Sequence, residues 1–398
     1  MNKTWNINPD NFCISPWTTM RIGERGDISY CKRAIDVGVY SDNFDLGYEY
    51  NNNEHFIQAR NSFLNGEFAS GCDKCVNEIS NNGKFRQGLN KLSAIYNNYL
   101  EESLVQSPSS YRLTSNNIQP AHILVMFNNE CNMACRMCSV KHSNLLSKLE
   151  GGDDKPQGWS KDTTKWDNFK KFIQESDKLE VLQLNGGEPL IQEEVNEILD
   201  IVKDKTNLQV VLTTNGTVYH SSIFDKFENF KSTFIDFSIE CFHDNNNYIR
   251  TGYSWQKIKE NIHKFILHRS EKINFGLHST IQIYSIDQLH TTLDFCIENN
   301  LELIANVVFD LELRVGLLPK DYREQLYNQY YKKFEDVEHV SVKRAHDSIK
   351  QQLLSTYEPS EELLINFLKR TRRQDSIFGT DFYKEYPHLV GFFKNYEM

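Results

Sequence analysis

Short apolar segments alternate with amphipathic segments through the middle of the chain. The apolar segments have the length and composition of strands and cover residues 121–128, 179–185, 208–214, 234–240, 273–283 and 301–309. Helical spacing of apolar residues fills the gaps, at residues 192–204, 222–230, 255–270 and 285–299. Six strands that alternate with helices predict a parallel sheet with right-handed crossovers, and they are too few for a closed eight-stranded barrel.

Three cysteines follow the first of these predicted strands, at Cys131, Cys135 and Cys138. Their Cys-x3-Cys-x2-Cys spacing lets three thiolates converge from one short loop onto a cubic iron-sulfur cluster, with one iron left open for a cofactor. Two alternatives remain open at this point. The thiols could bind zinc together with a distant fourth ligand, or they could be buried as small apolar side chains.

The second predicted strand runs into the turn Gly186, Gly187, Glu188 and Pro189. Two glycines let backbone carbonyls approach a ligand, a carboxylate can accept a hydrogen bond from an ammonium group, and the proline stiffens the turn before the next helix. The turn therefore suits the ammonium group of an amino acid. The alternative is a plain connection between a strand and a helix.

Together, the cysteine triplet and the Gly-Gly-Glu-Pro turn resemble the signature of the radical S-adenosylmethionine (SAM) superfamily. The resemblance implies a [4Fe-4S] cluster on the three cysteines, SAM chelated at the open iron, and a turn that holds the SAM amino group. It also implies a partial (β/α)6 TIM-like barrel. In such enzymes the reduced cluster cleaves SAM to methionine and a 5′-deoxyadenosyl radical, which abstracts a hydrogen atom from the substrate.

Further polar residues stand where the predicted strands end, which is the edge of a parallel barrel that gathers chemistry. They are Thr214, Asn215, Ser238, Glu240 and Thr280, and all five are expected to bind the cofactor. The resemblance implies that Thr214 and Ser238 contact the ribose and carboxylate of SAM. It also matches Arg250 to an arginine that pairs with the SAM carboxylate, a contact that suits the forked guanidinium group. An ordinary surface arginine is the alternative.

Four more cysteines precede the barrel, at Cys13, Cys31, Cys72 and Cys75. Four thiolates can ligate a second iron-sulfur cluster, [4Fe-4S] being the expected type, although a structural zinc accepts the same ligands. The surrounding sequence resembles the auxiliary-cluster modules called SPASM or twitch domains, in which a β-hairpin separates the first two ligands. Such a module usually follows the barrel, whereas here it precedes it.

These features predict four parts of the chain. They are an auxiliary-cluster module at residues 1–105, a linker at 106–119, the radical SAM barrel at 120–316 and a helical C-terminal extension at 317–398. The segment 148–171, with Trp159 and Trp166, is either a cover over the site or ordinary surface structure.

Composition indicates the expected cellular compartment and the kinds of partner. Nine cysteines in 398 residues, seven of them in motifs, favour metal ligation over disulfides, and the sequence shows no signal peptide or long apolar segment. A cytoplasmic enzyme without membrane attachment is expected. Lysine and arginine total 44 against 54 aspartates and glutamates, a net charge of −10, which argues against nonspecific nucleic-acid binding.

The sequence therefore predicts a radical SAM enzyme that oxidises, epimerises or cross-links a small molecule such as a sugar, amino acid or nucleoside. A peptide substrate is the main alternative, and a flavodoxin- or ferredoxin-like protein is the expected reductant. The auxiliary cluster could accept the electron left on the substrate. In a redox-neutral reaction Cys241 could return a hydrogen atom, although free cysteines are usually packing residues. A noncatalytic iron-sulfur or zinc protein is the remaining alternative.

Overall fold

The computed structural model describes residues 13–396, apart from residues 33, 35–37, 74 and 77–118. The chain divides into two compact units. The first comprises Met1–Asn128, Gln157–Gly186 and Glu193–Val210, and the second comprises Asn129–Pro156, Gly187–Gln192 and Val211–Met398. Most of the predicted linker, residues 106–118, lies outside the described residues.

The described part of the first unit contains strands in the order β3-β2-β1-β4-β6. Their bounds are β1 Thr19–Ile22, β2 Asp27–Ser29, β3 Val39–Tyr40, β4 His122–Met126 and β6 Val181–Asn185. The pairs β1–β4 and β4–β6 are parallel, whereas the N-terminal hairpin β1–β2 is antiparallel. The N-terminal segment thus joins the first predicted barrel strand in one sheet, a pairing that the sequence did not predict.

Among the described residues, five α-helices accompany this sheet: α1 Ser15–Thr18, α2 Leu46–Asn52, α3 Glu54–Leu64, α8 Thr163–Glu175 and α9 Glu193–Ile201. An aromatic core joins α8 to the N-terminal segment. Trp159 donates from its indole nitrogen to Met126 O at 2.8 Å and stacks on Phe44 with ring centroids 4.6 Å apart. Trp159 and Trp166 are both buried, so these tryptophans are core residues of the first unit and not part of an exposed cover.

The second unit contains the strand order β7-β8-β10-β11. The bounds are β7 Gln209–Thr214, of which the last four residues belong to this unit, β8 Ser232–Ser238, β10 Ile273–Ile281 and β11 Glu302–Val307. The pairs β8–β10 and β10–β11 are parallel. All six predicted barrel strands are therefore present, and the predicted mixed α/β fold with mainly parallel strands is confirmed.

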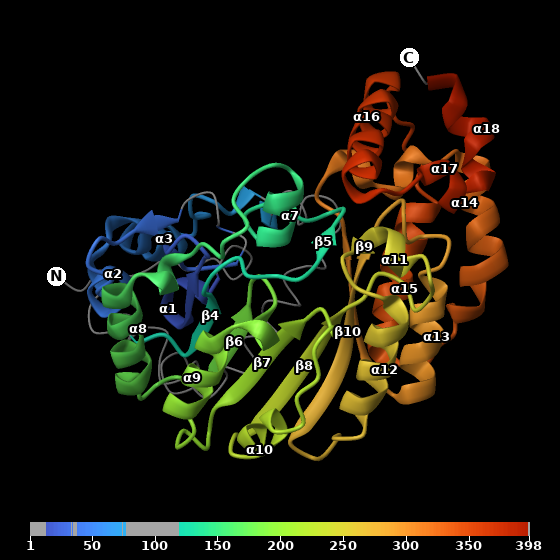
Figure 1. Cartoon of the computed structure of the whole chain (residues 1–398). Helices are drawn as coiled ribbons and strands as arrows, with labels where there is room; N and C mark the ends of the chain where they lie inside the picture. The colour runs from blue at the N-terminus through green and yellow to red at the C-terminus, as the bar shows by residue number, and fades with distance from the viewer. Residues whose placement is uncertain (1–12, 33, 35–37, 74, 77–118, 397–398) are drawn as a thin grey trace. The chain divides into compact units, whose positions relative to one another are not determined.

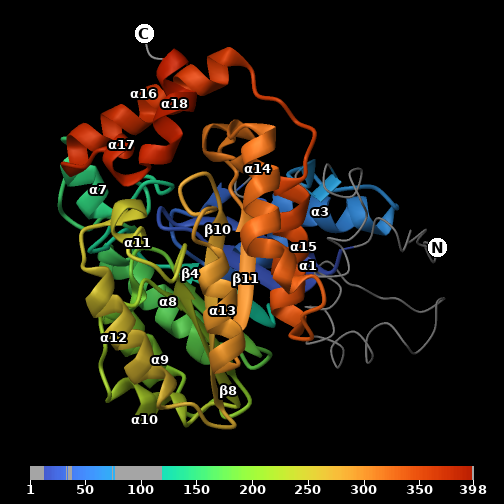
Figure 2. The ribbon, with the colours of Figure 1, turned by 90° about the vertical axis from the view of Figure 1, so that its right-hand side faces the viewer.

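Helices α10 Ile223–Phe227, α12 Trp255–Ile266 and α13 His290–Asn299 alternate with these strands as predicted. Helix α13 and the later helix α15 (Val340–Leu353) pack against β11, and both views show the helices on one side of the strands (Figures 1 and 2). The residues of β10 that face this side are buried, whereas Asn274, His278 and Thr280 on its other face are at least partly exposed. The second unit therefore has one closed and one partly open sheet face.

Helix α13 begins at His290, five residues later than predicted. The Ser285 hydroxyl donates to the carbonyls of Thr280 and Gln282, and such local bonds between a side chain and the backbone compete with a helix.

The predicted helical extension is also confirmed. After α14 (Lys320–Leu326) and α15 come α16 Glu361–Phe378, α17 Phe382–Glu385 and α18 Val390–Phe393, which gather at one end of the second unit (Figure 1). Helix α16 ends at Gly379, whose φ of 67° is the left-handed conformation favoured by glycine at a helix end. Among the described residues, no helix combines the length and apolar character needed to cross a membrane.

Candidate functional site

The cysteine triplet lies on one loop of the second unit, which includes the short strand β5 (Ala134–Cys135). The N–H of Cys131 donates to Asn144 Oδ1 at 2.8 Å, and the N–H of Cys138 donates to the carbonyl of Cys135 at 3.0 Å. Burial is the largest cause of the raised pKa of Cys131, and Cys135 and Cys138 raise it further. The three thiols therefore lie near one another, and they must lose their protons to bind a metal centre.

The Gly-Gly-Glu-Pro turn packs directly on this loop. Gly187 has a φ of 51°, and a Cβ atom there would lie 2.2 Å from the carbonyl oxygen of Glu130, next to the first cysteine. The N–H of Glu188 donates to the same carbonyl at 2.7 Å. Only glycine fits this close approach, which explains its place in the turn. Gly186, which belongs to the first unit, is also left-handed, with a φ of 84°.

The buried carboxylate of Glu188 serves the protein itself. Its Oε1 accepts from the hydroxyl of Thr214 at 2.6 Å and from the N–H of Leu190 at 3.0 Å, and its Oε2 accepts from the N–H of Asn215 at 2.5 Å. Burial is the main cause of its raised pKa. Glu188 thus fixes the end of β7 beside the turn, and the predicted contacts of Glu188 and Thr214 with SAM stay predictions. Pro189 begins the short helix Pro189–Ile191 that follows.

We expect Glu188→Ala to lower the free energy of unfolding by roughly 1–3 kcal/mol, because three buried donors would lose their acceptor. Urea unfolding would measure this loss. Glu193→Ala is the matched control, since Glu193 is exposed on α9. Equal stability of the two variants would contradict the structural role of Glu188.

Asn215 links the end of β7 to the cysteine loop. Its side-chain nitrogen donates to Asn132 Oδ1 at 2.9 Å and lies 4.0 Å from Cys131 Sγ. Thr217 completes the group, since its hydroxyl donates to Asn215 Oδ1 at 2.7 Å. The structure therefore brings Asn215 to the triplet, as expected for a residue at the carboxyl end of a strand.

Arg250 reaches the triplet through a short ladder that the sequence did not predict. Strand β9 (Arg250–Thr251) follows α11 (Asn246–Ile249) and pairs antiparallel with β5, so that Arg250 lies opposite Cys135. Its guanidinium also forms a buried ion pair with Glu240 at 2.5 Å. Arg250 is thus not the surface arginine considered above. Ser238, the last residue of β8, is half-buried.

Glu240 and Thr280 meet at the ends of neighbouring strands. Glu240 is fully buried, and its Oε2 accepts from the backbone N–H of Thr280 at 2.7 Å and from Gln282 Nε2 at 3.3 Å. Both carboxylate oxygens of Glu240 therefore contact the protein. Glu240 thus fixes the position of Arg250, and contact with a cofactor stays a prediction for both Glu240 and Thr280.

Three residues on the partly open sheet face were missed in the sequence. His278 Nδ1 lies 3.0 Å from Asp236 Oδ2, and its Nε2 lies 2.7 Å from Asn306 Nδ2. Asp236 is only 4% exposed, and its Oδ1 has no hydrogen-bond partner among the described residues. The strand pattern could have placed Asp236 and His278 on one face, because each lies an even number of residues from a predicted site residue at its strand end.

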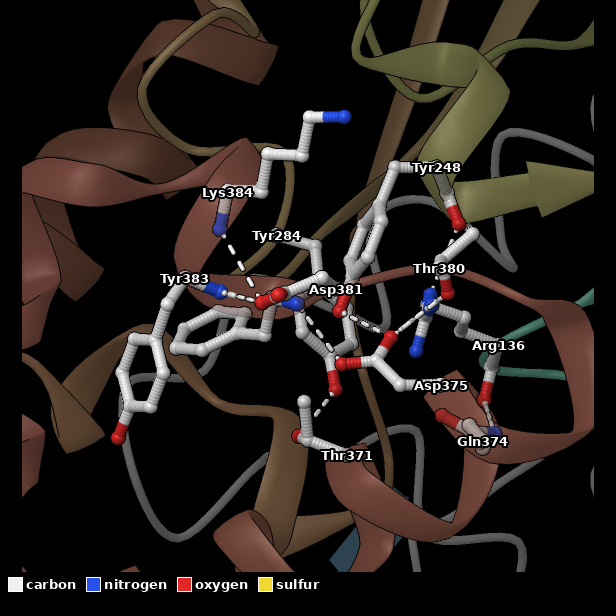
Figure 3. A network of polar contacts seen from close by, with 11 residues as sticks. Arg136, Tyr248, Tyr284, Thr371, Gln374, Asp375, Thr380, Asp381, Tyr383 and Lys384 are labelled. Carbon is white, nitrogen blue, oxygen red and sulfur yellow. Dashed lines mark hydrogen bonds and ion pairs between the residues drawn. The ribbon is translucent and has the colours of Figure 1, made fainter.

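The buried Arg136 was also missed, although it lies inside the cysteine motif. Its Nη2 donates to Asp375 Oδ1 at 2.6 Å, and its guanidinium carbon lies 3.5 Å from the centre of the Tyr248 ring (Figure 3). Asp375 also accepts from Tyr248, Thr380 and the N–H of Phe382. The carbonyl of Arg136 accepts from Arg370 and Gln374 of α16. The C-terminal extension therefore holds the cysteine loop by both the side chain and the backbone of Arg136.

The four N-terminal cysteines lie together in the first unit. The antiparallel hairpin expected between Cys13 and Cys31 is present as β1–β2. Burial is the largest cause that raises the pKa of Cys72 to about 12, and Cys13, Cys75 and Cys31 raise it further. Burial likewise raises the pKa of Cys13 to about 11. Across the described ranges, no group of three or more His, Cys, Asp or Glu side chains is spaced to hold a single metal ion.

Tyr30 supports the Cys72 end of this group. Its hydroxyl donates to the carbonyl of Ser70 at 2.5 Å and lies 3.8 Å from Cys72 Sγ. The N–H of Cys75 donates to the carbonyl of Cys72 at 2.9 Å, which closes the turn of the Cys-x2-Cys pair.

The other two cysteines are buried. Burial is the largest cause of the raised pKa of both Cys241 and Cys296. Cys241 Sγ contacts the carbonyl of His243 at 4.0 Å. A role of this buried thiol in hydrogen return stays a prediction.

Part of the chain matches a known protein family. Residues 125–296 match the family model described as the radical SAM superfamily. No curated protein matches the chain. The solved structure of native anSMEcpe with bound AdoMet is 20% identical over 54% of this chain and 60% of that chain, with a TM-score of 0.39. That of Streptococcus suis SuiB bound to precursor peptide SuiA is 14% identical over 81% and 70%, with a TM-score of 0.40.

The match to these structures is partial. The chain covers 57% of the length of a tagged form of anSMEcpe with bound AdoMet, at 17% identity and a TM-score of 0.38. Less than two thirds of that protein therefore has a counterpart here.

Proposed function

Because residues 125–296 match the radical SAM family model, we propose that the chain binds SAM beside a [4Fe-4S] cluster on Cys131, Cys135 and Cys138. One observation carries the proposal. The second unit alone brings the three thiols, the Glu188 turn and Arg250 together in one region. Three thiols leave one iron of a cubic cluster open, which fits a chelating cofactor.

The residues around the thiols also suit a cluster with bound SAM. Arg250 has a buried Nε–H without a partner among the described residues, beside Cys135, and such a donor suits an anionic group. When bound, the cluster and SAM would supply the electron and the 5′-deoxyadenosyl radical that takes hydrogen from an unactivated carbon. The chain's own residues would orient SAM and exclude water. The close-packed turn at Gly187 and the buried Glu188 suit that task, because their positions are fixed before any ligand arrives.

We place the substrate over the partly open face of β8, β10 and β11. Asp236, His278 and Asn306 offer acceptors and donors there. Asp236 and His278 lie two residues before Ser238 and Thr280 on their strands, and Asn306 pairs with Thr280 on the neighbouring strand. The unpartnered Oδ1 of Asp236 suits an N–H or O–H donor of the substrate. A small polar molecule is the first candidate and a peptide is the second, and a flavodoxin- or ferredoxin-like protein would supply electrons.

We propose that Cys13, Cys31, Cys72 and Cys75 bind an auxiliary iron-sulfur cluster. Two observations support the proposal: the expected hairpin β1–β2 lies between Cys13 and Cys31, and the N–H of Cys75 closes the Cys72–Cys75 turn by donating to the Cys72 carbonyl at 2.9 Å. Such a centre could accept an electron in a net oxidation.

The auxiliary centre gives a prediction on metal content. Replacing Cys72 and Cys75 by serine is expected to lower bound iron by about half, since one of two four-iron clusters would be lost. Metal analysis of the anaerobically reconstituted protein would measure this loss. Cys296→Ser, a change at a buried cysteine of α13, is the control and should keep the full iron content. Zinc instead of iron in the wild type, lost in the double variant, would assign the site to zinc.

The proposed function is tested by the release of 5′-deoxyadenosine from SAM by anaerobically reconstituted, chemically reduced protein. Release that rises on adding polar metabolites or peptides would also identify the substrate class. A protein that holds its iron but never cleaves SAM with either class would instead be a noncatalytic iron-sulfur protein.

A further inference from the structure

Arg250 and Cys135 are held opposite each other by the backbone. The two-residue ladder between β5 and β9 pairs Cys135 with Arg250 and Ala134 with Thr251. Directly opposite residues of antiparallel strands have Cβ atoms about 4.5–5.5 Å apart, so a side chain at one position reaches the other. Arg250 Nη1 indeed donates to Cys135 Sγ at 3.5 Å. The contact therefore follows from strand register as well as from the arginine's conformation.

The other end of the guanidinium is fixed. Its Nη2 donates to Glu240 Oε1 at 2.5 Å, and the two side chains are 12% and 0% exposed. Glu240 is itself held by Thr280 and Gln282. Arg250 thus cannot turn away from the sulfur without leaving a buried carboxylate unpaired, which is strongly unfavourable. Only its Nε remains without a partner among the described residues.

We propose that Arg250 is a positioning residue that tunes the cluster on the triplet through its hydrogen bond to Cys135 Sγ. The inference rests on the proposed function. Reduction adds negative charge to the cluster and its sulfur ligands, so a donor and a positive charge beside a ligand sulfur favour the reduced state. Arg250 therefore raises the reduction potential. Glu240, a buried negative charge on the far side of the guanidinium, opposes this effect and keeps it moderate.

This role differs from the expected contact of Arg250 with the SAM carboxylate. A pairing with SAM would act only when SAM is present. A hydrogen bond to Cys135 acts on the resting cluster, so the potential of the protein without SAM separates the two roles.

The experiment is a redox titration of the full chain, reconstituted with iron and sulfide, monitored by electron paramagnetic resonance without SAM. The signal of the triplet cluster is assigned by its loss when Cys131, Cys135 and Cys138 are replaced by alanine. For Arg250→Gln we expect about tenfold less reduced cluster at a given potential, equivalent to a downward shift of about 59 mV for one electron. For Glu240→Gln we expect a shift in the upward direction.

Opposite shifts of the two variants distinguish tuning from a merely structural role, which would not give opposite signs. Lys257→Gln is the control, because it removes a charge from the exposed Lys257–Glu260 pair of α12, where solvent screens it. It should leave the potential unchanged. If Arg250→Gln fails to hold the cluster, Glu240→Gln decides the question, and a potential that stays or falls in it overturns the inference.

Two other results would overturn the inference alone or the proposed function with it. An unchanged potential in Arg250→Gln, with weaker SAM binding in calorimetry, would overturn the inference and assign Arg250 to SAM. A wild-type protein without any signal from the triplet would overturn the proposed function, and the inference with it.

Discussion

Replacing Cys131, Cys135 and Cys138 together by alanine is expected to abolish the release of 5′-deoxyadenosine from SAM. The three thiols are the proposed ligands of the catalytic cluster, and two of them, Cys131 and Cys138, are partly exposed beside a buried third. Without thiolates no cluster assembles, and without a cluster no electron reaches SAM. Bound iron should fall by about half, because the proposed auxiliary centre would keep its own four cysteines.

Cys296→Ala is the matched control for this prediction. It removes a buried thiol from α13, outside both motifs, and should keep both the iron and the release of 5′-deoxyadenosine. Circular dichroism would verify that the triple variant keeps its fold. Undiminished SAM cleavage by the triple variant would refute the proposed function.

Asp375→Asn is expected to destabilise the cysteine loop strongly. Arg136 is fully buried, and Asp375 is the acidic partner of its guanidinium (Figure 3). Breaking a buried ion pair by removing one charge costs roughly 3–5 kcal/mol, because the other charge stays buried without compensation. Since Arg136 lies between two cysteines of the triplet, the variant should also lose iron faster to a chelator.

Arg373→Gln on the same helix provides the comparison for Asp375→Asn. Arg373 pairs with Glu150 in an exposed ion pair, with side chains 66% and 27% exposed, and such pairs contribute little. Urea unfolding and the rate of iron loss would be measured for both variants. If both behave alike, the network around Asp375 does not hold the loop.

A double variant, Arg136→Met with Asp375→Leu, separates charge from packing. Replacing a buried ion pair by apolar side chains of similar size is often neutral or stabilising, so the double variant should be more stable than Asp375→Asn. Lower stability of the double variant would show that the other hydrogen bonds of Arg136, to Thr380 and the carbonyl of Tyr248, carry more weight.

The local sequence pattern predicts the strands of the sheet but not all of their pairings. All six predicted strands between residues 121 and 309 are present, because each is an apolar segment of strand length bounded by turn residues. The pairing of β1 with β4 was not predicted, since it joins segments about a hundred residues apart and a local sequence pattern does not identify so distant a partner. The start of α13 was predicted too early for a local reason. The Ser285 side chain bonds to the backbone there, and that bond competes with the helix.

The amino-acid sequence was sufficient to predict which thiols could bind the cluster. The spacing of Cys131, Cys135 and Cys138 on one short loop, and the glycines of the turn at Gly187, are local features whose physical requirements are met within a few residues. The charges that surround the triplet could be found from the folded structure alone. Arg250 reaches Cys135 through a ladder across 115 residues, and Asp375 reaches Arg136 across 239. Such contacts depend on how distant segments pack, and the type of a residue does not identify the residue that it will contact.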